Sequence, residues 1–375
     1  MKTVFLSNYL NHHQKPLSDE LYRLTGGQYR FVATMPMSEA RRKLGYKELE
    51  APYLMTCYGE ESPGEEVARI IDEADLVIMG SAPYSYIADR CKAGKLVFKY
   101  TERLYRQEPG LLKLLVHHFR FRRQYDRYSN CHLLCASAFT ASDFRRIGCF
   151  RERAYRWGYF PAVKSIDIDE IMNSHLQAAK CCILWVARFL DWKHPELPIL
   201  LAESLKKRGM DFQIDMYGIG PEYGRIENLI STKNLNDRVV LHGAAPNEEI
   251  MKQMRTHSIF LFTSDRNEGW GAVANEAMGS GCAIVASDAI GSTPFLIEDT
   301  RDGLMFKDQD SQDLIDKVCY LINNPAKREA IGREAYKSMR EIWSPKNAAR
   351  NVMRLAESIL NGKPNPVQKG PCSSI

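Results

Sequence analysis

The chain has 375 residues, of which 45% are hydrophobic and 26% are charged. This length exceeds what one ordinary hydrophobic core organises, and it predicts two domains of roughly 150 to 200 residues each. No run of about 18 apolar residues occurs and the start, MKTVFLSNYLNHHQ, lacks an apolar core, so we expect neither a membrane-spanning helix nor a signal peptide. The net charge of +5 is too small to indicate nucleic-acid binding, and ten scattered cysteines without C-x-x-C spacing predict a reducing cytoplasm.

Short apolar runs alternate with polar, helix-like stretches in the first half of the chain. A helix is predicted over residues 16–25, where the pattern ends at Gly26. Strands that alternate with helices predict a parallel sheet covered on both faces. The predicted strands are residues 3–7, 29–34, 74–80, 95–100 and 132–137.

Positive charge is concentrated between Arg103 and Arg156, where twelve Lys or Arg and four Asp or Glu give a local charge of +8. Within this region, LLKLLVHHFRFRRQYDRY (111–128) predicts a helix that mixes large apolar side chains with cations. Such a helix can lie on an anionic membrane surface, and it can equally be a partly buried helix with a solvated basic face. We interpret His117 and His118 as surface residues of this helix.

The second half of the chain repeats the alternation more regularly and predicts a second doubly wound domain. Gly and Pro in WGYFPAVKSIDID (157–169) interrupt the pattern before an acidic, unpatterned segment, so the boundary is expected near residue 170. The predicted strands are 182–189, 212–218, 239–243, 258–264 and 282–287, and the predicted helices lie near 195–208, 222–231 and 247–255 and from about 271.

Two segments close the chain. Residues 345–361 read as a helix that begins at Ser344 and Pro345, and we expect it to pack back on the first domain. Residues 362–375 are rich in Pro, Gly and Ser and have little to bury, which predicts a disordered tail.

The loop DRNEGWG (265–271) carries the strongest chemical signal, because ligands of open α/β sheets lie beyond the carboxyl ends of the strands. Gly269 and Gly271 permit close backbone approach, and the helix start after them offers N–H groups that suit a phosphate. Glu268 and Glu276 add carboxylates that can accept hydrogen bonds from a ribose or hexose diol. A capping acid and a satisfied helix acid are the alternative interpretations.

Two cations follow the first strand of the second domain, at its carboxyl end. Arg188 and Lys193 in VARFLDWKHPE face the same crevice, where they can clamp a diphosphate; a solvated surface pair is the alternative. The stretch MYGIGPEYG (216–224), which contains Gly218, is only loosely similar to the dinucleotide fingerprint and by itself predicts a turn.

Together these residues resemble the retaining glycosyltransferases of family 4, which have the two-domain GT-B fold. The family's E-x(7)-E signature is matched by Glu268 and Glu276 in EGWGAVANE, followed by AMGSGCAIVAS, and its Arg and Lys pair is matched by Arg188 and Lys193. The resemblance is close over roughly residues 180–325, and before residue 170 it is a matter of architecture.

The resemblance implies an α/β protein with two doubly wound, Rossmann-like domains facing a central cleft. It implies an acceptor-side domain over 1–170 and a nucleotide-sugar donor domain over 171–344.

The resemblance also implies a role for each matching residue. Glu276 accepts the ribose hydroxyls of a UDP-type or GDP-type nucleotide sugar, and Glu268 holds the hexose. Arg188 and Lys193 neutralise the diphosphate, so no metal or other cofactor is expected. The implied donor-binding set is Gly269, Trp270, Gly271, Ala272, Glu276 and Gly218.

Two features depart from the family pattern. The loop SNYLNHHQKPLS has His12 and His13 where the family often has glycines. Where many members place a histidine after a mid-domain strand, KLVFKYTERLY offers Glu102, a candidate to bind a sugar hydroxyl or transfer a proton. The alternative is a structural acid paired with Arg103 or Arg106.

The leading hypothesis is a cytoplasmic, metal-independent retaining hexosyltransferase at the inner face of the cell membrane. It extends a lipid-linked or polysaccharide acceptor in envelope glycan synthesis. One alternative is an NAD-type oxidoreductase, which needs G-x-G-x-x-G after a first strand that neither TVFLSNY nor ILWVARF supplies. The other is a non-catalytic module that binds a nucleotide sugar.

Overall fold

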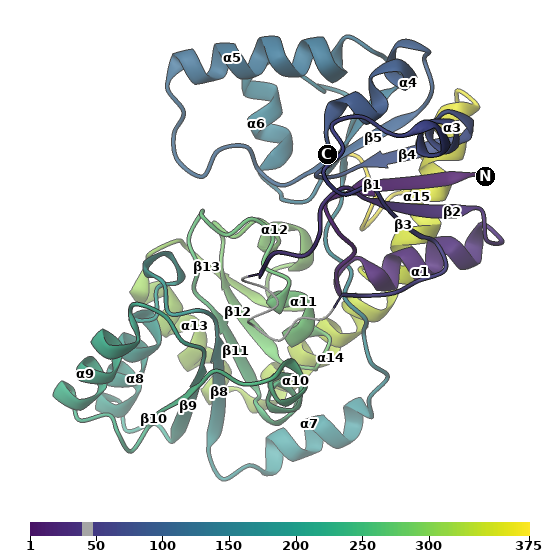
Figure 1. Ribbon diagram of the computed structural model, residues 1–375. Helices are drawn as coiled ribbons and strands as arrows, with labels where there is room; N and C mark the ends of the chain where they lie inside the picture. Colours follow the sequence, from purple (N-terminus) through teal and green to yellow (C-terminus); the bar gives the residue numbers. More distant parts are fainter. Residues whose placement is uncertain (40–47) are drawn as a thin grey trace. The chain divides into compact units, whose positions relative to one another are not determined.

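The computed structural model describes residues 1–39 and 48–375. The chain forms two α/β units (Figure 1): unit 1 comprises Met1–Ala162 and Ile342–Ile375, and unit 2 comprises Val163–Glu341. The expected boundaries at 170 and 344 therefore move to 162 and 341.

Unit 1 is built on a seven-stranded sheet in which every neighbouring pair of strands is parallel. The strands are β1 (Thr3–Ser7), β2 (Tyr29–Ala33), β3 (Leu54–Thr56), β4 (Leu76–Met79), β5 (Val97–Thr101), β6 (Cys131–Cys135) and β7 (Ala154–Arg156). Their order is β3-β2-β1-β4-β5-β6-β7, so β1 lies between β2 and β4. The predicted parallel sheet is confirmed, and the short strands β3 and β7 extend it at the two edges.

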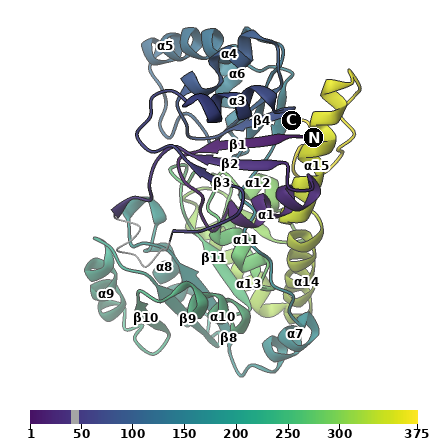
Figure 2. The same cartoon turned by 45° about the vertical axis from the view of Figure 1, so that its right-hand side comes forward.

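Helices cover this sheet. Val67, Ile71, Phe121 and Phe144 bury their side chains in one core with the strands. Figure 2 shows the last helix beside the first, and the two are in contact. The C-terminal helix thus belongs to unit 1. The helices are α1 (Lys15–Leu24), α3 (Glu65–Glu73), α4 (Ala88–Lys92), α5 (Leu111–Phe121), α6 (Thr140–Arg146) and α15 (Pro345–Leu360).

The end of the chain is ordered against unit 1, so the prediction of a disordered tail over 362–375 is wrong. The amide of Cys372 donates to the carbonyl of Arg156 at 2.6 Å, and the amide of Arg156 donates to the carbonyl of Ser373 at 2.9 Å. Cys372 is fully buried. Composition alone missed this contact because β7 is an edge strand, whose unpaired backbone groups bind a chain poor in apolar residues.

Unit 2 contains a six-stranded parallel sheet in the order β10-β9-β8-β11-β12-β13. Strands β8, β9, β11 and β12 are mostly buried, as expected of a sheet covered on both faces, whereas the edge strand β10 is partly exposed. The strands are β8 (Cys181–Val186), β9 (Phe212–Tyr217), β10 (Val239–Gly243), β11 (Ile259–Phe262), β12 (Ala283–Ser287) and β13 (Leu304–Phe306).

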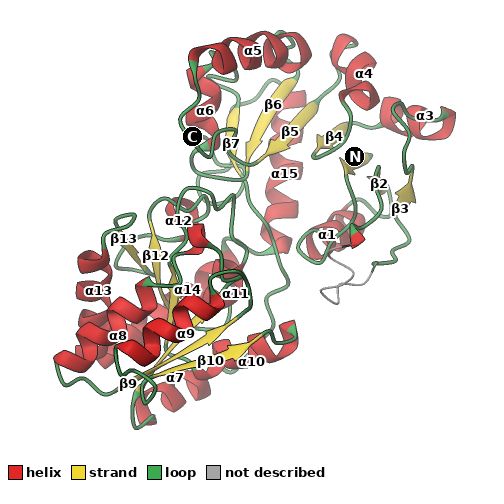
Figure 3. Ribbon diagram, turned by 60° about the vertical axis from the view of Figure 1, so that its left-hand side comes forward, coloured by secondary structure: helices red, strands yellow, loops and turns green. Residues whose placement is uncertain are grey.

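The helices of unit 2 form two packed groups, which confirms the doubly wound prediction (Figure 3). One group is α8 (Leu197–Lys207), α9 (Tyr223–Thr232) and α13 (Ser311–Asn323), and the other is α7 (Ile168–Gln177), α10 (Asn247–Thr256), α11 (Val273–Met278) and α14 (Pro325–Glu341), with the short α12 (Thr293–Leu296) before β13.

Unit 2 begins with a helix where the sequence showed no pattern. The side chain of Asp167 accepts hydrogen bonds from the amides of Asp169 and Glu170, both at 3.0 Å, and so caps α7. This cap explains why the boundary falls before the acidic segment rather than within it. Among the described residues, no helix has the length and hydropathy to cross a bilayer.

Candidate active site

The candidate site of unit 2 lies where the strand order reverses. The strand β8 comes first along the chain and lies between β9 and β11 in the sheet. The loops after β8 and β11 therefore leave the same edge on either side of a switch point, which is where ligands of open α/β sheets bind. These loops carry Lys193 and Glu268.

Lys193 and Glu268 form an ion pair, and only 12% and 13% of their side chains are exposed. The hydroxyl of Ser264 also donates to the Glu268 carboxylate, at 3.1 Å. The Lys193 ammonium lies 4.4 Å from the centre of the Trp192 ring. Glu268 is therefore held by a cation and a hydroxyl. It does not cap α11, because the N-cap residue is Ala272 and no side chain caps this helix. The sequence placed both charges at this edge but did not predict that they pair.

The turn before α11 can only be made by glycine. Gly271 has φ +78°, and a Cβ there would collide with the Phe262 ring. The indole of Trp270 is buried and donates to Asn275 Oδ1 at 2.8 Å. Trp270 can thus offer a ligand only its backbone, because its side chain belongs to the core. Within the described part of the chain, no backbone carbonyl accepts from the amides of Gly269, Gly271 or Ala272.

Glu276 lies on α11 in a different environment from Glu268. Burial raises its pKa to about 7, and a hydrogen bond with Asn247 partly opposes that rise. The carboxyl is therefore divided between its neutral and charged forms near neutral pH. Sequence reasoning did not single out Asn247, which is the first residue of α10.

Two other predicted residues lie at the ends of neighbouring strands. Gly218 follows β9 with φ +136°, and a Cβ there would collide with the carbonyl of Ala187. Close packing of the two strand ends thus accounts for this glycine without a ligand. Arg188 follows β8 with an exposed side chain, and among the described residues it makes no ion pair.

In unit 1, Glu102 lines a cavity of about 320 Å³ formed by the segments after β1, β4, β5 and β7. Its carboxylate accepts a hydrogen bond from the hydroxyl of Tyr159. Lys99 also lines the cavity and donates to the carbonyl of Gly80 at 2.7 Å, and burial lowers its pKa to about 8. His13 lines the cavity too, with its ring stacked 5.9 Å from that of Tyr159. Sequence reasoning missed Lys99 and Tyr159, although a lysine inside an apolar strand was a usable signal.

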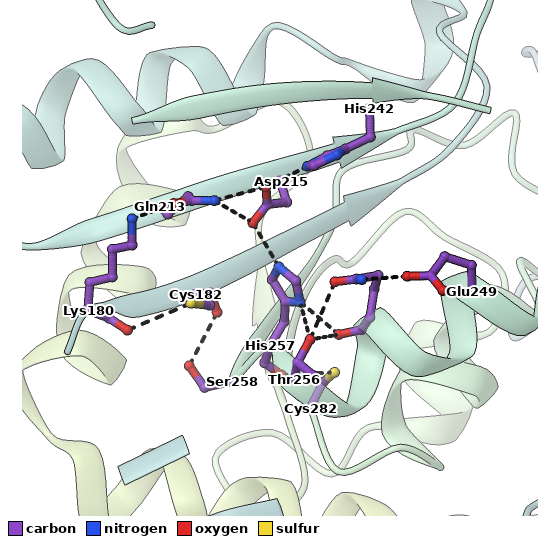
Figure 4. Close-up of polar contacts among 11 residues, drawn as sticks. Lys180, Cys182, Gln213, Asp215, His242, Glu249, Thr256, His257, Ser258 and Cys282 are labelled. Atoms are coloured by element: carbon purple, nitrogen blue, oxygen red, sulfur yellow. Dashed lines mark hydrogen bonds and ion pairs between the residues drawn. The ribbon is translucent and has the colours of Figure 1, made fainter. Parts of the chain in front are cut away.

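A second polar cluster in unit 2 surrounds Asp215 on β9 (Figure 4). Its carboxylate accepts from His242 Nε2 at 2.6 Å, from His257 Nε2 at 2.9 Å and from Gln213 Nε2 at 3.1 Å. Burial alone would raise the pKa of Asp215, but these donors outweigh it and hold the pKa at about 2. His257 Nδ1 also lies 2.7 Å from the carbonyl of Gln253, so the ring has a partner at each nitrogen.

Comparison with known proteins shows what the part of the chain around this site is similar to. Residues 167–338 match the family described as glycosyl transferases group 1. The alpha-D-kanosaminyltransferase of Streptomyces kanamyceticus is 29% identical over 190 residues, which are 49% of this chain and 49% of that protein. The poly(ribitol-phosphate) alpha-N-acetylglucosaminyltransferase of Staphylococcus aureus is 27% identical over 184 residues, which are 49% of this chain and 36% of that protein. The matches thus cover half or less of these relatives.

The fold matches over nearly the whole chain. The crystal structure of Alr3699/HepE from Anabaena, in complex with UDP, aligns with 96% of this chain and 100% of that chain at a TM-score of 0.68 and 16% sequence identity. This likeness covers both α/β units. Residues 167–338, under half of the chain, are thus similar to the group 1 glycosyltransferases, and the two parallel-sheet units have the GT-B fold.

Proposed function

We propose that the chain is a retaining hexosyltransferase that moves a hexose from a nucleotide sugar to a hydroxyl of a lipid-linked or polysaccharide acceptor. The observation that carries the proposal is the buried pair of Lys193 and Glu268 at the switch point of a group 1 glycosyltransferase domain. A cation and an acid beside a glycine turn suit a ligand that presents phosphate and hydroxyls side by side.

The donor is proposed to bind across the loop and the start of α11. Glu276 accepts the ribose hydroxyls, Glu268 accepts those of the hexose, and the amides of Gly269 and Gly271 donate to phosphate oxygens. UDP is the first candidate, since Alr3699/HepE was solved with UDP, and GDP is the second. Lys193 has three N–H donors, so it can keep its ion pair with Glu268 and still donate a hydrogen bond to the diphosphate.

The reaction breaks the bond between the anomeric carbon and the diphosphate oxygen. The acceptor oxygen bonds to the same face of that carbon, and its proton passes to the departing phosphate. Lys193, Arg188 and the loop amides stabilise the charge on the leaving diphosphate. This is the role that a divalent ion has in other transferases, so neither a metal nor another cofactor is proposed.

The acceptor is proposed to bind in unit 1. The cavity beside Glu102 offers a carboxylate and amide groups that can hold sugar hydroxyls. The Staphylococcus aureus relative is named for a poly(ribitol-phosphate) acceptor, which supports an envelope glycan as the acceptor. A lipid-linked precursor of such a glycan, at the cytoplasmic membrane face, is part of the proposal. The comparisons give no support to the NAD-type oxidoreductase or to the non-catalytic module. Assignment to family 4 stays a prediction.

A panel of UDP-hexoses and GDP-hexoses tests the proposal, with release of nucleoside diphosphate as the readout. We expect one donor to be turned over, and Lys193→Met to lower kcat/KM for it by at least about tenfold. The matched control is Lys252→Met, which changes an exposed lysine of the same unit. Equal rates in wild type and Lys193→Met, or no turnover of any donor, would contradict the proposal.

A further inference from the structure

The helix α5 turns a large apolar face to solvent. A surface helix usually buries its apolar side, and contiguous exposed apolar patches mark interaction sites. At about 100° per residue, five large apolar residues of α5 fall within an arc of about 140°. Their exposed fractions are 81% for Leu111, 76% for Leu112, 55% for Leu115, 55% for Val116 and 67% for Phe119.

The opposite side of α5 is fixed to unit 1. His117 Nδ1 lies 2.9 Å from the hydroxyl of Tyr105, and His118 Nδ1 lies 2.7 Å from the carbonyl of Ile147. Phe121 packs edge-on against Phe144 with ring centres 4.9 Å apart. These contacts prevent the helix from rolling its apolar face inward. They also correct the interpretation of the two histidines as plain surface residues, since each has a partner in the unit.

Cations border the apolar face. Lys113 and Arg120 come at about 180° to 200° on the helical projection, next to the apolar arc. The chain continues into a π-helical turn, Arg122–Asp126, whose first two residues are exposed arginines. Within the described part of the chain, Lys113, Arg120, Arg122 and Arg123 form no ion pair. The face therefore combines exposed apolar area with uncompensated positive charge.

We propose that α5 docks on an anionic lipid bilayer, with its apolar face among the acyl chains and its cations at the phosphate headgroups. Two partners could cover this apolar face, a second copy of the chain or an anionic bilayer, and the charge around the face distinguishes them. A second copy of the chain would bring two strongly basic surfaces together, whereas anionic headgroups complement them. If the basic face of α5 were only solvated, the exposure of its five apolar side chains would have no explanation. The inference rests on the proposed function, which puts the acceptor at a membrane face, and it adds the element that holds the protein there; vesicle binding and turnover are measured separately, so each can fail alone.

Vesicle sedimentation of the full chain tests the proposal. The probe is vesicles of phosphatidylglycerol and phosphatidylcholine in equal parts, with pure phosphatidylcholine as reference. We expect wild type to bind the anionic vesicles. The triple variant L112Q/L115Q/F119Q should lose at least about tenfold in binding at both low and high salt. The variant R120Q/R122Q/R123Q should lose binding mainly at low salt, where charge attraction is least screened.

A matched control separates insertion from a general loss of apolar surface. The variant L176Q/Y320Q/L360Q changes three exposed apolar residues on other helices and should bind as wild type does. Unchanged thermal unfolding would show that each variant is folded. Wild-type binding by L112Q/L115Q/F119Q would overturn the proposal. Self-association of wild type through this face without vesicle binding, followed by sedimentation velocity, would overturn it in favour of a second copy.

Discussion

The two glutamates of the E-x(7)-E spacing have different electrostatic surroundings. Glu268 is paired with Lys193, whereas burial raises the pKa of Glu276 to about 7. The spacing in the sequence predicted both positions. It could not predict these surroundings, because the pairing depends on a lysine 75 residues away and the pKa depends on burial.

Nucleotide binding should therefore depend on pH through Glu276. A charged carboxylate accepts hydroxyl hydrogen bonds better than a neutral one, so affinity for the nucleoside diphosphate should rise as pH rises through about 7. Glu276→Gln should weaken binding by roughly 10 to 150 fold at pH 8 and remove the pH dependence. Calorimetry checks this, with Glu268→Gln as the companion variant. That variant should lower turnover and leave nucleoside diphosphate affinity nearly unchanged. Near-wild-type affinity of Glu276→Gln at pH 8 would contradict the ribose assignment.

The raised pKa of Glu276 also predicts how stability depends on pH. Stability should fall as pH rises, whereas nucleotide affinity should rise. The folded-state pKa of Glu276 lies above its ordinary value of 4.5, so the folded protein binds this proton more tightly. The free energy of unfolding should then fall as pH rises from about 4.5 to about 7 and level off above that. At pH 8, Glu276→Gln should unfold at a higher temperature than wild type, and below pH 4.5 the two should coincide. Thermal unfolding at both pH values measures this, and a less stable Gln variant at pH 8 would refute it.

Asp215 carries a structural charge rather than a catalytic one. Its folded pKa of about 2 lies below the ordinary 3.8, so its contribution is present above about pH 4 and is lost as pH falls toward 2. Asp215→Asn removes the carboxylate that accepts from His242, His257 and Gln213, and it should cost about 3 kcal/mol at pH 7. Urea unfolding checks this. The control, Asp237→Asn, breaks an exposed pair that water screens, and it should cost clearly less than Asp215→Asn. Equal costs for both variants would contradict the role of Asp215.

At the scale of elements, the pattern of apolar residues predicted most strands of both sheets. It missed the helix and the tail segment that depend on specific hydrogen bonds. The runs at 3–7, 212–218 and 282–287 correspond closely to β1, β9 and β12 because buried parallel strands are continuous apolar runs. The helix α7 was missed because its signal is the cap at Asp167 rather than a long apolar stripe. The tail was missed because its partner is the edge of β7, more than 200 residues earlier.

The tail should stabilise unit 1 measurably. Val367 and Cys372 are buried, and the backbone of Arg156 pairs with that of Cys372 and Ser373. Deleting residues 366–375 should cost about 2 to 4 kcal/mol, since two apolar side chains return to water and an edge strand loses its partner. Thermal unfolding of the deletion variant measures the loss. Removing only Ile375, which is partly exposed, is the control. A deletion variant as stable as the control would show that the tail contacts contribute nothing.

For the whole molecule, we predict that turnover needs no metal ion, since protein groups are proposed to neutralise the diphosphate. Because Lys193, Arg188 and the loop amides are proposed to carry the diphosphate charge, EDTA should change turnover by less than about twofold. The assay is initial rate with and without EDTA, then with added magnesium or manganese. Loss of most activity in EDTA and its return with either metal would contradict the metal-independent mechanism.

Two domains of parallel sheet were predictable from length and alternation, and the E-x(7)-E spacing of Glu268 and Glu276 indicated a glycosyltransferase donor domain in the second. The first domain has no such signature: its cavity collects side chains from four separate segments of the chain, so no single stretch of sequence reveals it. This is why Glu102 was predicted while Tyr159, its hydrogen-bond partner, was not.

The central claim is transfer of a hexose with retained configuration, and proton NMR of the turnover reaction tests it most directly. The donor is the nucleotide sugar identified by the panel, in EDTA, followed through the signal of its anomeric proton. We predict that this signal decays and that the first product signal has the same anomeric configuration as the donor. The product is observed early, before any free sugar interconverts between its two anomers in water. A first product of inverted configuration would contradict the retaining mechanism, and a donor signal that never decays would contradict glycosyl transfer itself.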